Sequence, residues 1–133
     1  MSFLRGDKIA VTRQTRFGEV EHEAIYVGWI LGYYGYWVIE NHKEKGVQYS
    51  LFEDFANDQA VRLVARIARD RAEQEAIIHR AEQMLGTPYH AVFFNCEHLA
   101  NFAQTGSASS PQLQRYVAGA ILGAMVAGLI WNA

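Results

Sequence analysis

Apolar and polar positions alternate in short runs along the first fifty residues of the chain. Runs with a period of two that are rich in isoleucine, valine, tyrosine and tryptophan are typical of half-buried strands. Turns that contain glycine or charged residues separate successive runs, so we expect neighbouring strands to pair antiparallel. The strands that this pattern predicts are residues 8–13, 22–30, 36–41 and 47–49.

Two shorter elements follow before the pattern becomes helical. Ser50 and Glu53 have the spacing of a capping box, which predicts a short helix over residues 51–56. Apolar residues then alternate with arginines from 61 to 67, which predicts a strand with one exposed face.

Two helices are predicted in the second half of the chain from apolar spacing and capping residues. Asp70 precedes residues 71–85, where apolar residues recur at helical spacing, and Gly86 ends this stretch. Asn95 precedes the second helix, which covers residues 96–104 and ends at a glycine. The fold class is therefore predicted to be α+β, with an N-terminal antiparallel sheet packed on helices.

An uncharged stretch ends the chain behind a polar linker over residues 107–110. Residues 116–131 would be apolar on every side of a helix, which is typical of a buried or membrane helix. As a helix they would extend over about 24 Å, somewhat less than the roughly 30 Å core of a bilayer. We expect residues 107–133 to form a linker and an apolar C-terminal helix that contacts a membrane. The alternative is a helix docked on protein.

Small residues recur along this predicted helix at the spacing that lets two helices approach closely. The glycines concerned are Gly119, Gly123 and Gly128. A homo-oligomer formed through this helix is therefore a second expectation.

The composition of the chain limits its possible classes. The 133 residues, half of them hydrophobic, suffice for one domain with a core, which we place at residues 1–106. The formal net charge of −2 gives no electrostatic case for nucleic acid. The N-terminus lacks the apolar segment of a signal peptide, and a single cysteine allows no internal disulfide. We therefore expect a cytoplasmic protein that its C-terminal helix holds at a membrane.

The single cysteine, Cys96, falls in the first turn of the predicted helix that follows Asn95. Unpaired backbone N–H groups and the positive end of the helix dipole favour a thiolate at such a position, and the same groups can stabilise an oxyanion. A nucleophilic cysteine is one interpretation. The other is a buried, inert cysteine, since lone cysteines are among the most buried residues.

Five histidines are candidates for the base that such a thiol requires. His22 opens a predicted strand, which would hold its ring rigidly, and His42 follows the next strand beside three charged residues. His90 lies in the run that leads to the cysteine and has no further distinguishing feature. We expect His79 to be solvated on a polar helix face and His98, two residues after the cysteine, to support local structure.

Two segments of the chain together carry a family resemblance. The first reads His-Glu-Ala-Ile-Tyr-Val-Gly over residues 22–28, and the second reads Asn-Cys-Glu-His-Leu-Ala over residues 95–100. Either segment alone is a weak indication, whereas the two in this order are quite specific. They resemble the lecithin:retinol acyltransferase (LRAT)-like family, the circularly permuted branch of the NlpC-type papain-like enzymes. The resemblance covers about residues 5–106 and implies that fold.

The resemblance implies that Cys96 is the nucleophile and that His22 is the general base that activates it. An ester or amide substrate would acylate Cys96, and water or a second acceptor would then take the acyl group. The histidine precedes the cysteine because the fold is permuted, and spatial roles define such a site. We expect no cofactor, and one cysteine with scattered histidines forms no known zinc spacing.

Many members of the family carry a second histidine on the third strand, where it orients the base. Simple alignment of Val38 and Ile39 with that strand places Glu40 at this position. A glutamate can accept an N–H from imidazole and fix its tautomer. His42 lies two residues further, on the same face if the strand continues, and is the second candidate for this role.

Three functions remain open from the sequence. The first is a membrane-associated thiol acyltransferase or a hydrolase of phospholipids and other acyl esters, which the apolar C-terminal stretch favours. The second is a papain-like cysteine peptidase or amidase, which Cys96 and His22 would serve equally well. The third is a non-enzymatic effector module that has kept the fold. It gains weight if Glu40 and His42 both point away from His22.

Overall fold

The computed structural model describes residues 2–91 and 95–107 of the chain. The predicted C-terminal helix, including residues 116–131 and its three glycines Gly119, Gly123 and Gly128, lies outside the described residues. No helix within the described part is long and apolar enough to cross a membrane.

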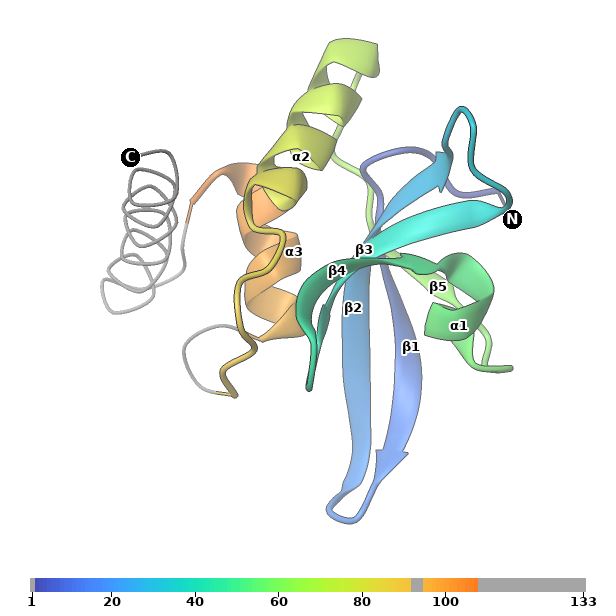
Figure 1. The fold of residues 1–133 in the computed structure, drawn as a ribbon, viewed down its shortest axis with the longest axis vertical. Coiled ribbons are helices and arrows are strands. Elements are labelled where there is room, and N and C mark those ends of the chain that lie inside the picture. Colours follow the sequence, from blue (N-terminus) through green and yellow to red (C-terminus); the bar gives the residue numbers. More distant parts are fainter. Residues whose placement is uncertain (1, 92–94, 108–133) are drawn as a thin grey trace, which may run out of the picture.

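Five strands form one antiparallel sheet, which together with the helices confirms the predicted α+β class (Figure 1). The strand order is β4-β3-β2-β1-β5, so β1 to β4 pair as successive hairpins and β5 returns to the far side of β1. The strands are β1 (Lys8–Thr15), β2 (Gly18–Trp29), β3 (Tyr36–His42), β4 (Gly46–Leu51) and β5 (Arg62–Ala65).

The strand β2 is longer than the sequence pattern predicts, because it begins at Gly18 instead of at His22. Residues 18–21 are all exposed, so they show no apolar alternation. Their backbone nevertheless pairs with β1 as far as the Thr15–Gly18 pair. Backbone hydrogen bonds, which side-chain patterns do not report, extend this strand.

Three helices complete the described fold: α1 (Phe52–Ala56), α2 (Arg71–Gln83) and α3 (Cys96–Thr105). The predicted cap of α2 is confirmed, since Asp70 Oδ1 accepts the backbone N–H of Glu73 at 2.9 Å. α2 ends at Gln83, two residues before the predicted end.

The predicted capping box of α1 is wrong. Leu51 precedes this helix and makes no side-chain cap, while Ser50 belongs to β4. Ser50 therefore lies in the sheet, where its side chain makes a different contact, which is described below.

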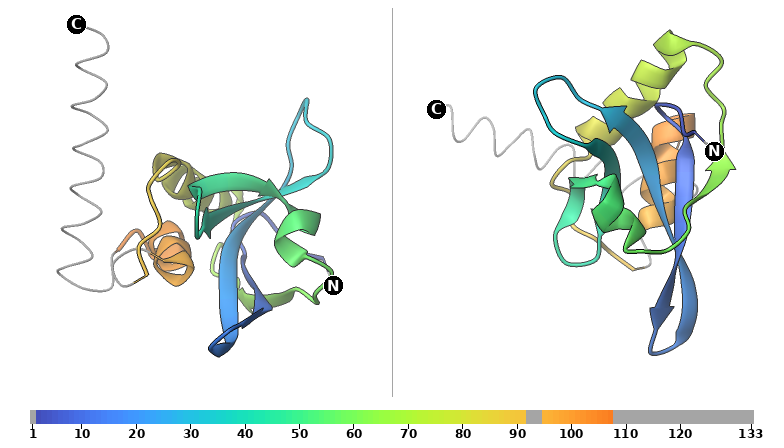
Figure 2. Two further views of the ribbon diagram at one scale, coloured as in Figure 1. Left: turned by 60° about the horizontal axis from the view of Figure 1, so that its bottom comes forward. Right: turned by 90° about the vertical axis from the view of Figure 1, so that its right-hand side faces the viewer.

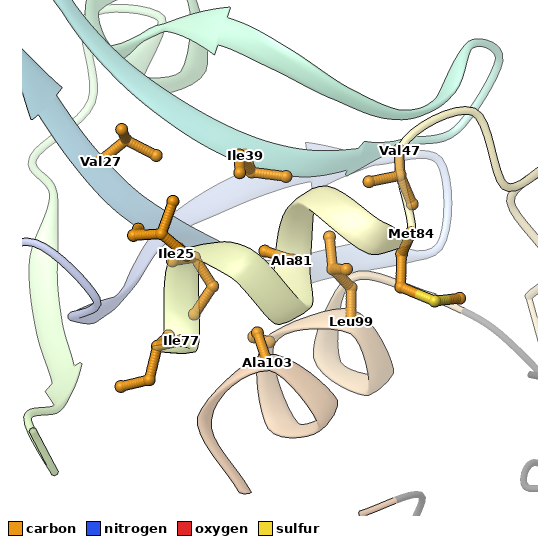
Figure 3. Close-up of a cluster of buried hydrophobic side chains, with 11 residues drawn as sticks. Ile25, Val27, Ile39, Val47, Ile77, Ala81, Met84, Leu99 and Ala103 are labelled. Atoms are coloured by element: carbon orange, nitrogen blue, oxygen red, sulfur yellow. The ribbon is translucent and has the colours of Figure 1, made fainter. Parts of the chain in front are cut away.

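Helices cover the two faces of the sheet unequally (Figure 2). α2 and α3 cover one face, where Ile25, Val27 and Ile39 of the strands meet Ala81 and Leu99 of the helices (Figure 3). α1 lies on the other face, above a smaller cluster built around the fully buried Phe55. Because side chains alternate between faces, successive residues of β2 point to different layers. His22 and Ala24 share the α1 face, whereas Ile25 and Val27 point to the larger helices.

Candidate active site

β2 and β3 separate at one end of the sheet, and this separation makes room for the site. Their pairing ends at Ala24 and Glu40. β1 and β2 stay paired to their turn at Thr15 and Gly18, while β3 and β4 stay paired to His42. The β1–β2 hairpin therefore projects beyond the rest of the sheet, at the bottom of Figure 1. We call the opening between the two ribbons the fork.

Cys96 is the first residue of α3, and its side chain reaches β2 at the fork. Its Sγ lies 3.8 Å from the backbone oxygen of Glu21, the residue before His22. A reciprocal capping box fixes this first turn: Asn95 Oδ1 accepts the N–H of His98, and His98 Nδ1 accepts the N–H of Asn95, both at 3.2 Å. The predicted cap at Asn95 and the local role of His98 are thus both confirmed.

The ring of His22 lies between the cysteine and a carboxylate. Its Nε2 is 3.1 Å from Oε1 of Glu40, and it also interacts with the Cys96 thiol. Because Glu40 engages Nε2, the other ring nitrogen, Nδ1, is the one available to sulfur. The His22 side chain is only 17% exposed and packs against the ring of Phe55, with the centroids 5.4 Å apart.

The neighbours of His22 determine its protonation. Burial disfavours the charged imidazole, but hydrogen bonds and charge interactions with Cys96 and Glu40 outweigh it and raise the pKa of His22 to about 9. The ring therefore carries a proton at neutral pH. A protonated histidine beside a thiol is placed to donate that proton to a leaving group.

Glu40 belongs to a hydrogen-bonded chain that ends on β4. Burial raises the pKa of the Glu40 carboxyl, but hydrogen bonds from His22 and Ser50 outweigh it, so the pKa lies below its ordinary value. Ser50 Oγ in turn accepts a hydrogen bond from Gln48 Nε2 at 3.0 Å. Each group in the chain thereby polarises the next, and Glu40 stays ionised although it is only 5% exposed.

His42 lies on the same strand face as Glu40, as predicted, but its ring serves its own turn. Its Nδ1 accepts the backbone N–H groups of Glu44 and Lys45, each at 3.1 Å. The structure thus brings Glu40 against His22 and uses His42 in the β3–β4 turn.

The other two candidate histidines differ from His22 in being exposed. His79 is exposed on α2, with Nε2 3.3 Å from Gln83 Nε2, and His90 is exposed before α3. Among residues 2–91 and 95–107, no group of three or more histidine, cysteine and carboxylate side chains is arranged to hold a metal ion.

A cleft of about 550 Å³ opens over the fork, which is within the usual size of a small-molecule site. Cys96, His22 and Glu40 all line it. The β1–β2 hairpin contributes one side, and the turn after β3 contributes another. Further lining residues are Phe17, Val20, Lys43, Tyr89 and Glu97.

The first turn of α3 offers donors for an anionic oxygen. In the described part of the chain, the backbone N–H groups of Cys96 and Glu97 donate to no protein acceptor. Such groups at a helix N-terminus favour negative charge. A carbonyl oxygen bound beside Cys96 is therefore within reach of donors that suit a tetrahedral intermediate.

Two residues of the site were missed in the sequence. Ser50 contacts Glu40, yet its spacing to Glu53 indicated a helix cap instead. Phe55 supports the His22 ring from α1, and no local pattern connects a short helix to a strand thirty residues earlier. The Ser50 contact follows from the register of β3 and β4, in which Ser50 is two positions along from Gln48, the direct partner of Glu40.

The chain is similar in sequence to known proteins. A family model described as "permuted papain-like amidase enzyme, YaeF/YiiX, C92 family" matches residues 6–99. Lecithin retinol acyltransferase of Mus musculus and that of Rattus norvegicus are each 32% identical to the chain over 78 residues. The match covers 56% of this chain and 34% of each relative, so only about a third of their length is represented. These matches confirm the resemblance to permuted papain-like proteins.

Proposed function

Because this chain belongs to the permuted papain-like amidase family C92 (YaeF/YiiX), we propose that it cleaves an acyl amide or ester through a thioester on Cys96. One observation carries the proposal: the ring of His22 joins Cys96 to the buried carboxylate of Glu40. A nucleophile, a base and a group that orients the base are the parts that thiol catalysis requires.

Acylation follows from the positions of these groups. Cys96 Sγ attacks the carbonyl carbon, and its proton resides on His22. The carbonyl oxygen becomes negative and is stabilised by the N–H groups of Cys96 and Glu97. When the intermediate collapses, the bond from carbon to the leaving nitrogen or oxygen breaks, and His22 gives its proton to that atom. The product is an acyl-thioester, with the amine or alcohol released.

Deacylation uses the same groups in the reverse roles. His22, now neutral, takes a proton from water as the water oxygen attacks the thioester carbon. The intermediate collapses with release of Cys96 and of the free acid. Glu40 holds Nε2 throughout and stabilises the positive charge on the ring.

Transfer to an alcohol or amine is the second candidate function. It is favoured by the similarity to two proteins whose names describe an acyltransferase, and by the uncharged stretch at residues 116–131. We propose that this stretch holds the cleft near acyl lipids. An acceptor in place of water would give transfer by the same steps.

The effector interpretation loses support from the site. It would gain weight if Glu40 and His42 both pointed away from His22, whereas Glu40 Oε1 is 3.1 Å from the His22 ring.

Steady-state hydrolysis of a chromogenic acyl anilide and the matching acyl ester tests the proposal. We expect His22→Ala to lower kcat/KM by about 10²- to 10⁴-fold, the usual contribution of a general acid–base group. His42→Ala is the matched control, because His42 lines the same cleft but bonds to its own turn. It should change kcat/KM by less than about threefold on the same scale. Equal effects of the two variants would contradict the assignment.

A further inference from the structure

A second hollow lies at the opposite end of the sheet from Cys96, beside the β2–β3 loop at the top right of Figure 1. Its volume is about 700 Å³. From the described part of the chain, aromatic rings, one charged group and two glycines line it. The side chains are Trp29, Tyr33, Tyr34, Tyr36, Phe52 and Glu53. We call this the aromatic hollow.

The aromatic rings of the hollow are exposed to an unusual degree. Trp29 is 61% exposed, Tyr36 is 62% and Tyr34 is 93%. Folding therefore buries little of the surface of these rings, so packing in the core does not explain why aromatic residues occupy these positions. The chain carries no charge from 28 to 39, so the loop presents aromatic surface almost alone.

The fold holds three of these rings, Trp29, Tyr33 and Tyr36. Trp29 and Tyr36 are direct cross-strand partners at the end of β2 and β3, so their side chains lie next to each other. Tyr33 packs edge-on against Trp37, with centroids 6.4 Å apart and an angle of 85° between the planes. Gly35 has φ +91° and lies so close to Leu51 that a Cβ there would be 2.9 Å from its Cδ2. The loop is thus fitted against β4.

Among the described residues, Glu53 is the one charged side chain that lines the hollow. It is exposed, and no arginine, lysine or histidine of the described residues forms an ion pair with it. Electron-rich ring faces together with a free carboxylate suit a weakly hydrated cation. The same carboxylate disfavours an anion, and a purely apolar ligand would gain nothing from it.

We propose that the aromatic hollow binds a quaternary ammonium group, such as the trimethylammonium group of choline. This chemistry is shared by free choline compounds and by the choline headgroup of a lipid bilayer. The site is independent of the proposed thioester chemistry, since none of its residues lines the cleft over Cys96.

Titration of the full chain with choline tests the recognition, followed by the NMR shift of the Trp29 indole N–H. We expect saturable binding, and we expect 3,3-dimethylbutan-1-ol, its neutral isostere, to bind more weakly. Tyr34→Ala and Glu53→Gln should each raise the dissociation constant about two- to fivefold, as expected for an exposed cation–π contact and an exposed ion pair, respectively. Equal binding of the neutral isostere, or no saturable binding of choline, would overturn the proposal.

Two matched controls guard against general effects of substitution. Phe17→Ala removes an aromatic ring that is also 93% exposed but lies at the other end of the sheet. Asp54→Asn removes the carboxylate next to Glu53 that does not line the hollow. Both should bind choline as the wild type does. If they weaken binding as much as Tyr34→Ala and Glu53→Gln, the hollow is not the site.

Vesicle co-sedimentation then separates the two sources of the ligand. Phosphatidylcholine and phosphatidylethanolamine vesicles differ in the methyl groups of the headgroup and not in net charge. A preference for phosphatidylcholine that Tyr34→Ala reduces supports the proposal with the lipid headgroup as the source. Saturable choline binding without this preference supports it with a free choline compound as the source.

Discussion

At the scale of single residues, the proton on His22 determines the pH range in which the site can work. The raised pKa depends on two neighbours, Cys96 and Glu40, which act against the burial of the ring. The lowered pKa of Glu40 depends in turn on a hydrogen bond from Ser50, so the series of contacts extends from the sulfur of Cys96 to the edge strand β4. Substitutions in this series of contacts should therefore shift the pH profile of kcat/KM.

Glu40→Gln should move the alkaline limb of kcat/KM to lower pH. In the wild type, activity should fall as pH rises through about 9, because His22 then loses the proton that the leaving group needs. A neutral amide can still accept from Nε2 but supplies no charge, so the ring loses its proton at lower pH. Ser50→Ala should also move the alkaline limb to lower pH, but by a smaller amount than Glu40→Gln.

The measurement is kcat/KM from pH 5 to 10.5 for these variants, with His79→Ala, an exposed histidine of α2, as the control. A merely structural role would lower activity equally at every pH. An unchanged limb in Glu40→Gln would contradict the role of Glu40.

The pairing of His22 and Glu40 should also appear in the free energy of unfolding. The folded-state pKa of His22 is raised, so its stabilisation is present in full below about pH 6.5 and is lost as pH rises through about 9. The pKa of Glu40 is lowered, so its stabilisation is present above about 4.5 and is lost as pH falls. The pair should therefore stabilise the fold most between about pH 4.5 and 6.5.

Urea unfolding of the wild type and His22→Ala at several pH values measures this. The difference in free energy of unfolding should be largest near pH 6 and should shrink by on the order of 2–3 kcal/mol towards pH 9.5. A difference that does not change with pH would exclude a charged pair.

At the scale of elements, the first turn of α3 sets the position of Cys96. Asn95→Ala should remove the cap and destabilise the protein by about 1 kcal/mol. It should also lower kcat/KM, because the turn that carries the sulfur loses its reciprocal hydrogen bonds. Asn95→Ser, which keeps a capping oxygen, should restore most of both.

Measurements of the free energy of unfolding and of kcat/KM on the same samples of these variants test this prediction. Loss of stability without loss of activity would show that the cap does not position Cys96.

The bounds of an element could be predicted from the sequence where side chains determine them. They could not be predicted where backbone hydrogen bonds or pairing with a distant strand determines them. The caps at Asp70 and Asn95 were predicted because a side-chain oxygen makes each of them. The exposed start of β2 was missed because residues 18–21 show no apolar alternation, and the backbone pairing with β1 that extends the strand leaves no pattern of side chains. Within the site, the sequence and the family resemblance indicated Cys96 and His22 and ranked Glu40 before His42, and only the structure shows the turn contacts that occupy His42.

At the scale of the whole molecule, the sheet separates two surfaces with different chemistry. The fork holds the cleft over Cys96, and the far end holds the aromatic hollow. Described residues line both surfaces, and we propose that the uncharged stretch from 116 onward is an addition to this layout.

Removal of residues 108–133 should therefore leave stability in urea unchanged but abolish flotation with liposomes. Vesicles without choline headgroups should be used, so that the aromatic hollow makes no contribution. The full chain should float with them, because residues 116–131 can bury apolar surface in the bilayer. Equal partitioning of the two proteins would remove the membrane role of this stretch.

The thioester itself is the most direct test of the account. The full chain is mixed with an activated acyl donor, quenched in acid within one turnover and weighed intact by mass spectrometry. The account predicts a mass gain of one acyl group that maps to Cys96, is released by neutral hydroxylamine, is absent in Cys96→Ala and forms far more slowly in His22→Ala. An adduct that persists in Cys96→Ala, or that forms at the same rate in His22→Ala, would contradict it.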